Sequence, residues 1–242
     1  LQVSHGYIKS PELMHPGESS GKYNASGLKT ETIFQLLSSS FEKHNEDDYN
    51  DFYYERNLPE MLSREGPKIA VADVNGDQLD DIYIGGAKGQ AGQLYLQGTS
   101  GFKKSPQNVF GRFEDFEDVA VLFFDCDGDN DKDLFIGSGG NNLPPRSRSL
   151  QHRLLKNDGK GNFAPDSAAF PANDMNISVA VENDFDGDGD LDLFVGSKSV
   201  PYKYGVSPTC YLYRNDGKGH FTDVAKSMNP AIAEPGMVTG AA

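Results

Sequence analysis

The sequence predicts an all-β fold built from about three four-stranded antiparallel units. A nine-residue acidic phrase occurs three times, at 73–81, 125–133 and 184–192, and the starts are 52 and 59 residues apart. Short apolar stretches rich in β-branched and aromatic residues enter and leave each phrase, as strands do. This spacing fits a four-stranded sheet per repeat better than a helical hairpin.

Each repeat predicts its elements in the same order. A first strand enters the acidic loop (IAVADV, VAVLFFD, ISVAVEND) and a second leaves it (DIYIGG, DLFIGSGG, DLFVGSKS). After a variable loop, a third strand leads into a glycine turn and a phenylalanine: QLYLQGTSGF, RLLKNDGKGNF and YLYRNDGKGHF. The turns at 157–161 and 215–219 are typical of hairpins, because Gly and Asn tolerate positive φ. This order is that of one β-propeller blade.

Hairpin connections alternate between the two ends of such a blade. We therefore expect the acidic loops and the NDGKG turns on one face, and the variable loops 86–93, 139–153 and 197–211 on the other. Loops of this kind carry function, and the candidates for ligand contact are Arg146, Arg148, Tyr202 and Tyr204. The alternatives are that the arginines are solvated and that the tyrosines pack against a neighbouring blade.

The acidic phrases carry oxygen side chains at positions 1, 3, 5 and 9, and a backbone carbonyl at position 7 can complete the cage. Calcium takes six to eight such oxygens, so the sequence predicts about three Ca²⁺ ions. The metal ligands expected are Asp73, Asn75, Asp77, Leu79 and Asp81; Asp125, Asp127, Asp129, Asp131 and Asp133; and Asp184, Asp186, Asp188, Asp190 and Asp192. Leu79, Asp131 and Asp190 would contribute their carbonyls. Without a counter-ion, acids at this density repel one another.

The backbone of the loops needs glycine-like conformations. Position 4 is Gly76, Gly128 or Gly187, and position 6, where positive φ is expected, is Gln78, Asn130 or Gly189. Gln78 makes the first loop the poorest fit. An EF-hand would need a bidentate Glu at position 12, but this position holds strand residues in all three copies, so we expect calcium to pin a strand-to-strand turn and to be mainly structural.

Charge and hydropathy exclude some partners. The formal net charge is −14 at pH 7, which argues against nucleic acid and for cations or neutral ligands. The longest purely apolar run, 119–124, is far shorter than the roughly 20 residues of a spanning helix, so no membrane insertion is expected. Of the two cysteines, Cys126 replaces an apolar residue at position 2 of its loop, although one bridge to Cys210 stays possible.

Together these motifs resemble FG-GAP or VCBS repeats, the calcium-binding blades of integrin α-subunit-like propellers. The resemblance includes the subgroup of cartilage acidic protein and its bacterial ASPIC/UnbV relatives. It rests on the three acidic loops with their exit strands, on NDGKGNF and NDGKGHF, and on FEKHNEDDYNDFYYERNLPEMLSREGP before the first loop, and it covers about residues 41–242. It implies an extracellular or surface protein that binds calcium and serves adhesion or ligand capture, with no shared catalytic residues.

The expected domain organisation follows from where the repeats lie. Residues 1–40 do not follow the repeat and are interpreted as a linker or the tail of a preceding domain, and 41–242 as the propeller segment. A closed propeller needs about four to eight blades. The stretch GMVTGAA at 236–242 aligns with the strands that enter the acidic loops. The sequence therefore predicts an incomplete propeller, a fragment whose missing blades are partners.

Three hypotheses for function follow. The leading one is a non-enzymatic, calcium-stabilised segment whose variable-loop face binds a protein or a glycan. The alternative is part of a carbohydrate-active enzyme, a glycoside hydrolase or polysaccharide lyase, which would need convergent titratable groups on that face. Candidates such as His152 and His220 are few, and no catalytic residue is assigned. In the third hypothesis the segment is only scaffold.

Overall fold

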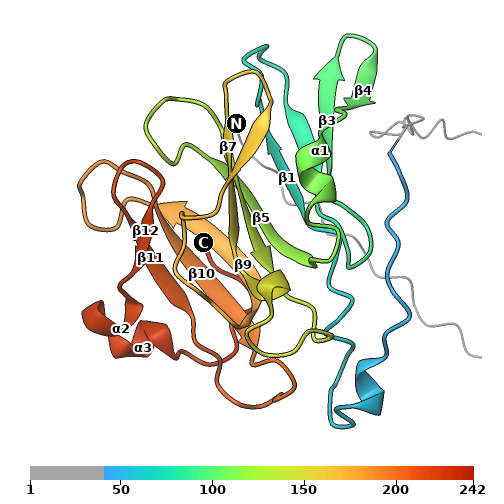
Figure 1. Cartoon of the computed structure of the whole chain (residues 1–242). Coiled ribbons are helices and arrows are strands. Elements are labelled where there is room, and N and C mark those ends of the chain that lie inside the picture. The colour runs from blue at the N-terminus through green and yellow to red at the C-terminus, as the bar shows by residue number, and fades with distance from the viewer. Residues whose placement is uncertain (1–40) are drawn as a thin grey trace, which may run out of the picture. The chain divides into compact units, whose positions relative to one another are not determined.

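The computed structural model describes residues 41–242, and the linker expected at 1–40 lies outside the described residues. Three four-stranded antiparallel sheets confirm the predicted fold class, and the strands of each sheet follow chain order (Figure 1). We call the sheets blades 1 to 3. They contain β1 (Ile69–Ala72), β2 (Asp81–Ile84), β3 (Gln93–Gly98) and β4 (Gly101–Lys104); β5 (Asp118–Phe124), β6 (Asp133–Ser138), β7 (Arg153–Asn157) and β8 (Phe163–Asp166); and β9 (Asn176–Asn183), β10 (Asp192–Ser199), β11 (Tyr211–Asn215) and β12 (Phe221–Asp223).

Helices are few and short in this part of the chain. They are η1 (Asp51–Tyr53), α1 (Asn108–Gly111), η2 (Arg148–Leu150), α2 (Ala225–Met228) and α3 (Pro230–Ala233). Among residues 41–242, no helix has the length and apolar character to cross a membrane.

The blades pack face to face through their first strands, since β1 contacts β5 and β5 contacts β9. Blade 2 is buried on both faces because it packs against blade 1 on one side and blade 3 on the other. Alternate residues of its strands point to opposite faces of the sheet. Leu134 and Ile136 of β6 enter the core shared with blade 1, and Phe135 between them enters the core shared with blade 3. This two-sided burial explains why β6 is apolar throughout its centre.

The outer faces of the array differ. On blade 1, Ile69 and Val71 of β1 are more than half exposed, which is the apolar end expected of an open array. On blade 3, α2 and α3 cover Phe194 and Leu212. Residues 236–242 form no strand in the structure. Instead, Val238 N–H donates to Ser197 O at 2.9 Å, beside the end of β10.

Hydrogen bonds between neighbouring blades confirm the prediction that the acidic loops and the NDGKG turns lie on one face. Asn157, the first residue of the blade 2 hairpin turn, donates from Nδ2 to Val74 O in the first acidic loop at 2.7 Å and to Lys132 O in its own blade at 3.2 Å. Asn215 repeats this, donating to Cys126 O at 2.8 Å and to Leu191 O at 3.0 Å. Each asparagine therefore joins two consecutive acidic loops.

At the opposite end, residues 41–66 form an extended segment that we call the strap (blue in Figure 1). Near its start, Glu42 N–H donates to Tyr95 Oη of blade 1 at 2.9 Å. Asp47 accepts from Asn142 Nδ2 in the variable loop of blade 2 at 2.9 Å. Near its end, Glu60 pairs with Lys198 of blade 3 at 2.7 Å. The strap thus connects all three blades, a role that the sequence did not predict.

Beneath the strap lies a buried carboxyl group, that of Glu117, which is 1% exposed. Its Oε2 accepts from Lys88 N–H at 2.9 Å, and its Oε1 has no hydrogen-bond partner among residues 41–242. Burial, with the nearby charge of Glu46 adding to it, raises the pKa of Glu117 from 4.5 to about 8. The strap therefore covers an acid that holds its proton at neutral pH.

Replacing Asn157 by Ala is expected to lower the free energy of unfolding by about 1–3 kcal/mol, because two buried carbonyls lose their donor. Urea denaturation with calcium present measures this. The control is Asn162→Ala in the same hairpin, since Asn162 is exposed and its Nδ2 binds only Asp158. Equal losses in both variants would contradict the bridging role.

Glu117 is expected to make stability depend on pH. Its folded-state pKa lies above the unfolded value, so the folded state binds an extra proton between them and stability falls as pH rises from 4.5 to about 8. Glu117→Gln should remove this slope and be more stable than the wild type above pH 8, as judged by urea midpoints across the range. The exposed Glu114→Gln variant is the control, and a slope that survives in Glu117→Gln would refute the assignment.

Candidate metal-binding loops

The first aspartate of each acidic loop organises the turn around itself. In the first loop, Asp73 Oδ1 accepts from Gly76 N–H at 2.7 Å and Oδ2 accepts from Gln78 N–H at 2.7 Å. The corresponding bonds reach Asp125 from positions 4 and 6 at 2.8 and 2.9 Å, and Asp184 at 2.7 and 3.0 Å. Burial acts to raise the pKa of Asp73, but the backbone N–H groups outweigh it, so this pKa is lowered.

The left-handed backbone predicted at positions 4 and 6 is present in all three loops. The glycines at position 4 have φ of 77° to 80°, and Gln78 and Asn130 at position 6 have φ of 68° and 69°. Side chains adopt this region only where surrounding contacts compensate. The hydrogen bonds to the first aspartate supply that compensation, so Gln78 does not prevent the first loop from closing.

The ninth position holds a buried carboxylate with the same two partners in every blade. One oxygen accepts from the N–H at position 2 of its own loop, and the other accepts from an N–H of the third strand. The pairs are Val74 and Gln97 on Asp81 at 3.1 and 2.7 Å, Cys126 and Asn157 on Asp133 at 3.0 and 2.8 Å, and Phe185 and Asn215 on Asp192 at 3.2 and 2.8 Å. Burial raises the pKa of all three. The ninth residue therefore ties loop to sheet as well as being a candidate ligand.

Two of the three loops bring three metal-ligating side-chain atoms within 4.8 Å of one another. The groups are Asp125, Asp127 and Asp129; Cys126, Asp127 and Asp133; and Asp184, Asp186 and Asp192. Within residues 41–242, no such group of three includes an acid of the first loop, where position 3 is Asn75. The second and third loops are thus the better formed cation sites.

The second loop also has an oxygen without a partner. Asp127 is about one-fifth exposed, and its Oδ2 pairs with Lys156 Nζ at 3.0 Å. Its Oδ1 is buried and has no hydrogen-bond partner among the described residues. A divalent cation suits such an oxygen, and hard cations prefer carboxylate ligands. The donor set therefore fits a hard divalent cation better than a soft metal, because burial strongly raises the pKa of the Cys126 thiol.

The seventh residues place their side chains against the hairpin turns. A Cβ at Gly217 of the blade 3 NDGKG turn would lie 2.5 Å from Asp190 Oδ2, and a Cβ at Gly159 of the blade 2 turn would lie 2.6 Å from Asp131 Oδ2. The backbone N–H of each seventh residue donates to the aspartate at position 5 of the same loop at 2.9 to 3.0 Å. The pairs are Leu79 and Asp77, Asp131 and Asp129, and Asp190 and Asp188. Glycine is required here both for the positive φ and for this close approach.

The tyrosines predicted for ligand contact lie against the strap. Tyr204 N–H donates to Glu55 Oε1 at 2.8 Å, and the ring of Tyr202 lies 6.5 Å from that of Tyr54. Arg146 and Arg148 line cavities beside the variable loop of blade 2. The structure does not bring the arginines and the tyrosines into one site.

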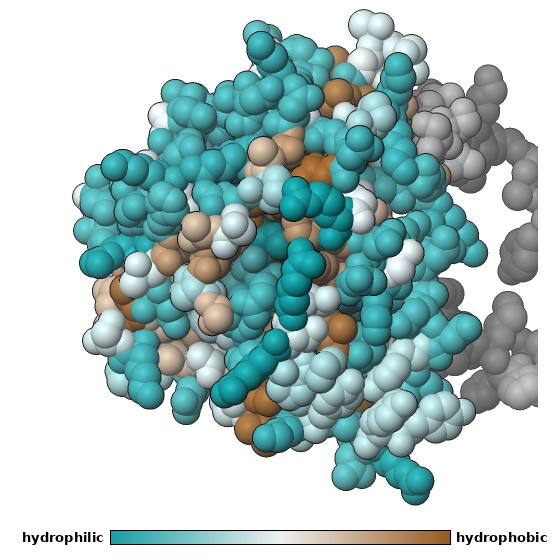
Figure 2. Space-filling model, in the orientation of Figure 1, coloured by the Kyte–Doolittle hydropathy of each residue, from teal (hydrophilic) through white to brown (hydrophobic). Residues whose placement is uncertain are grey.

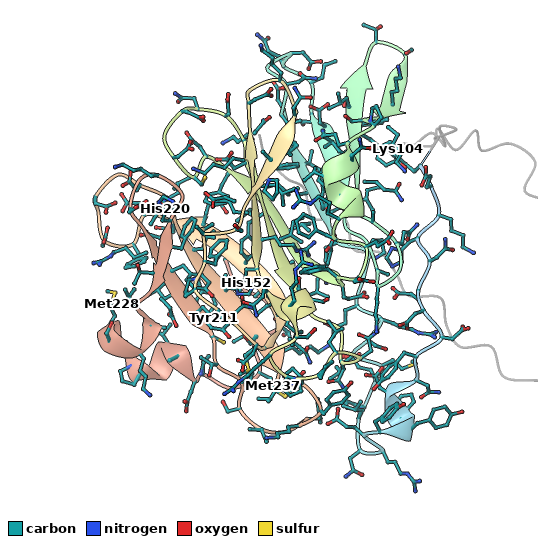
Figure 3. The ribbon with its side chains drawn as sticks, viewed as in Figure 1. Lys104, His152, Tyr211, His220, Met228 and Met237 are labelled. Carbon is teal, nitrogen blue, oxygen red and sulfur yellow. The ribbon has the colours of Figure 1, made fainter. Side chains whose placement is uncertain are left out.

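The two histidines considered for catalysis lie apart from each other, His152 just before β7 and His220 in the turn between β11 and β12 (Figure 3). His152 is 7% exposed and is surrounded by the rings of Phe135, Phe170, Tyr211 and Tyr213. Burial lowers the pKa of His152 to about 3, so it is a neutral core residue. His220 pairs with Asp216 at 3.2 Å in its hairpin turn. Cys126 and Cys210 are free thiols, so the bridge left open by the sequence does not form.

The sequence reasoning missed the asparagine that joins consecutive loops and the second role of the ninth aspartate. A signal for the asparagine was present, since each NDGKG turn begins with it, but it was interpreted only as a turn residue. Its contacts with the preceding blade span 83 and 89 residues of sequence. No local pattern indicates contacts at such a separation.

Comparison with known proteins identifies the repeats. A family model described as FG-GAP-like repeat matches residues 73–136, 125–195 and 184–241. Each match begins at the first aspartate of an acidic loop. No curated protein matches the chain.

Asp186 offers a clean test of metal binding, because its side chain makes no hydrogen bond to the protein within residues 41–242 although it belongs to the third acidic group. Calcium titration by calorimetry should detect a weakest site at the first loop. The Asp186→Ala variant should either lose one of the tighter calcium sites or bind calcium at that site about tenfold or more weakly, because the number of charged ligands tunes calcium affinity. The exposed Glu182→Ala variant, a control of equal charge, should titrate like the wild type. A titration that Asp186→Ala leaves unchanged would rule out the third loop as a site.

Proposed function

The chain belongs to the FG-GAP-like repeat family, and from this premise we propose that residues 41–242 form a calcium-stabilised ligand-binding module of an extracellular or cell-surface protein. The observation that carries the proposal is the threefold repetition of one loop geometry. Each loop closes around its first aspartate and is anchored by its ninth. Two of the loops gather acidic oxygens as a cation would require.

Calcium is the ion that this donor set favours. The loops offer carboxylate, amide and carbonyl oxygens, which calcium accepts in irregular geometry, whereas magnesium demands near-octahedral geometry and retains several waters. The three phrases hold 14 of the 36 acidic residues, and a bound divalent ion reduces their mutual repulsion.

The role proposed for calcium is structural. Val74 and Cys126, at position 2 of their loops, offer the carbonyls that the asparagines of the next blade bind. An ion that rigidifies a loop therefore also rigidifies the joint between blades. Metal binding then contributes to folding free energy, because the unfolded chain has no preformed site.

We assign ligand binding to the end of the blades that carries the variable loops, and the ligand we propose is a protein. Among residues 41–242, the only two histidines considered for catalysis are a neutral core residue and a turn residue at the metal end, which favours a binding module over an enzyme. The strap coincides with the FEKHNEDDYNDFYYERNLPEMLSREGP motif. On that basis we place the chain in the subgroup of cartilage acidic protein and the ASPIC/UnbV proteins, with an adhesion role.

Thermal unfolding in calcium, in magnesium and in EDTA tests the proposal. Calcium at about 100 times its dissociation constant should add about 2.7 kcal/mol per independent site, raising the midpoint by several degrees, and magnesium should do much less. Indifference to calcium would overturn the metal assignment. Hydrolysis or cleavage of a polysaccharide panel by the purified chain would overturn the non-enzymatic one.

A further inference from the structure

Four of the seven arginines of the chain line two adjoining cavities. The cavities have volumes of about 480 and 470 Å³, and they share Arg148 and Gln151. Arg112 and Arg153 line the first, and Arg146 lines the second. Seen from this side, strongly hydrophilic atoms run in a line across the surface with apolar atoms beside them (Figure 2). Arg153 forms an ion pair with Asp118, which leaves Arg112, Arg146 and Arg148 as the uncompensated positive groups of the cavities in a chain of net charge −14.

Arg153 lines the first cavity and is held in place by its neighbours. It is 7% exposed, and its Nη2 donates to Asp118 Oδ1 at 2.5 Å and to Ser138 Oγ at 3.0 Å. Its guanidinium carbon lies 4.3 Å from the ring centroid of Phe116 and 5.3 Å from that of Phe113. Stacking of this kind orients a guanidinium group and leaves its charge in place.

The other three arginines are available to a ligand. Arg112, Arg146 and Arg148 are exposed, and within residues 41–242 none has an acidic partner at ion-pair distance. Arg148 lies 5.9 Å from the centroid of Phe116, so the same ring borders two guanidinium groups. Two acids, Asp166 and Asp174, also line the cavities, which leaves the positive groups in excess.

Backbone conformation supports a functional reason for this arrangement. Arg146 has φ of 63°, which is uncommon for a side chain of this kind. Residues held in sparsely populated conformations cluster at binding sites. The strained residue thus lies where the unpaired arginines gather.

We propose that the arginine cavities bind an acidic peptide segment of a partner protein, whose carboxylates pair with Arg112 and Arg148 and whose apolar side chain lies against Phe113. This inference rests on the proposed ligand-binding function and names the ligand class. Guanidinium groups bind carboxylates through paired hydrogen bonds. The apolar side chains that line the cavities offer contact area to an apolar side chain of the peptide, and a ligand with acidic groups alone would not use this area.

The strap provides a precedent within the chain. It is itself an acidic extended segment, and its Asp47 and Glu55 accept from Asn142 and Asn141 of the variable loop 139–153 at 2.9 and 2.5 Å. The same loop continues to Arg146 and Arg148. A second acidic peptide would therefore dock on the part of this loop that the strap does not use, and this favours a peptide over an acidic polysaccharide.

The probe is a fluorescein-labelled peptide of alternating Glu and Phe, with binding measured by fluorescence anisotropy on the whole chain in calcium. The test variant is Arg112→Gln with Arg148→Gln, and the matched control is Lys103→Gln with Lys226→Gln, which removes equal charge from exposed residues elsewhere. The first should weaken binding by about tenfold or more, because charge-assisted pairs are lost. The second should bind as the wild type does, and binding should weaken at about 1 M salt.

Three results would overturn the inference. These are no binding by the wild type, equal loss in both variants, or equal binding of a peptide with Lys in place of Glu. Stronger competition by polygalacturonate than by unlabelled peptide would replace the peptide with an acidic glycan. Thermal unfolding with calcium is run on the same samples. A calcium shift that persists without peptide binding refutes this inference alone, whereas loss of the shift refutes the proposed function.

Discussion

A carboxylate buried at the ninth position of each acidic loop is the constraint on which the rest of the structure depends. Burial disfavours its charged form, and each of its oxygens accepts a backbone N–H as compensation, one from its own loop and one from the third strand. The loop must therefore close over the sheet for the charge to be tolerated. Closure in turn gathers the remaining acids at the surface, where a cation reduces their repulsion.

Assembly of the blades follows from the same geometry. With the loop closed, the carbonyl at position 2 faces the next blade, and Asn157 or Asn215 binds it there. Consecutive loops are then joined by a side chain that is itself fixed by the ninth aspartate through its backbone N–H. Loop closure and blade contact are thus linked through adjacent atoms to the acidic groups that could hold a metal ion, and this linkage supports the structural role proposed for the metal.

The two ends of the module differ in charge and in chemistry. The end with the acidic loops carries acids on short, repeated turns. The opposite end carries variable loops of unequal length, the strap across all three blades, and four arginines in adjoining cavities beside one of those loops. Arg112, Arg146 and Arg148 of these cavities have no acidic partner at ion-pair distance within residues 41–242, so this part of the variable-loop end is suited to an anionic ligand, whereas the acidic loops are suited to a cation.

The sequence by itself determined the blade, the loop and the face on which each loop lies. These features have a short period, and residues such as Asp73 and Gly76 make their decisive hydrogen bonds within a few positions of one another. Only the tertiary structure decided that His152 enters an aromatic core, that Tyr202 and Tyr204 meet the strap, and that Arg112 and Arg148 line the same cavity. Those contacts join residues far apart in the sequence. These contacts depend on how one sheet stacks on the next, and no local pattern in the sequence indicates that stacking.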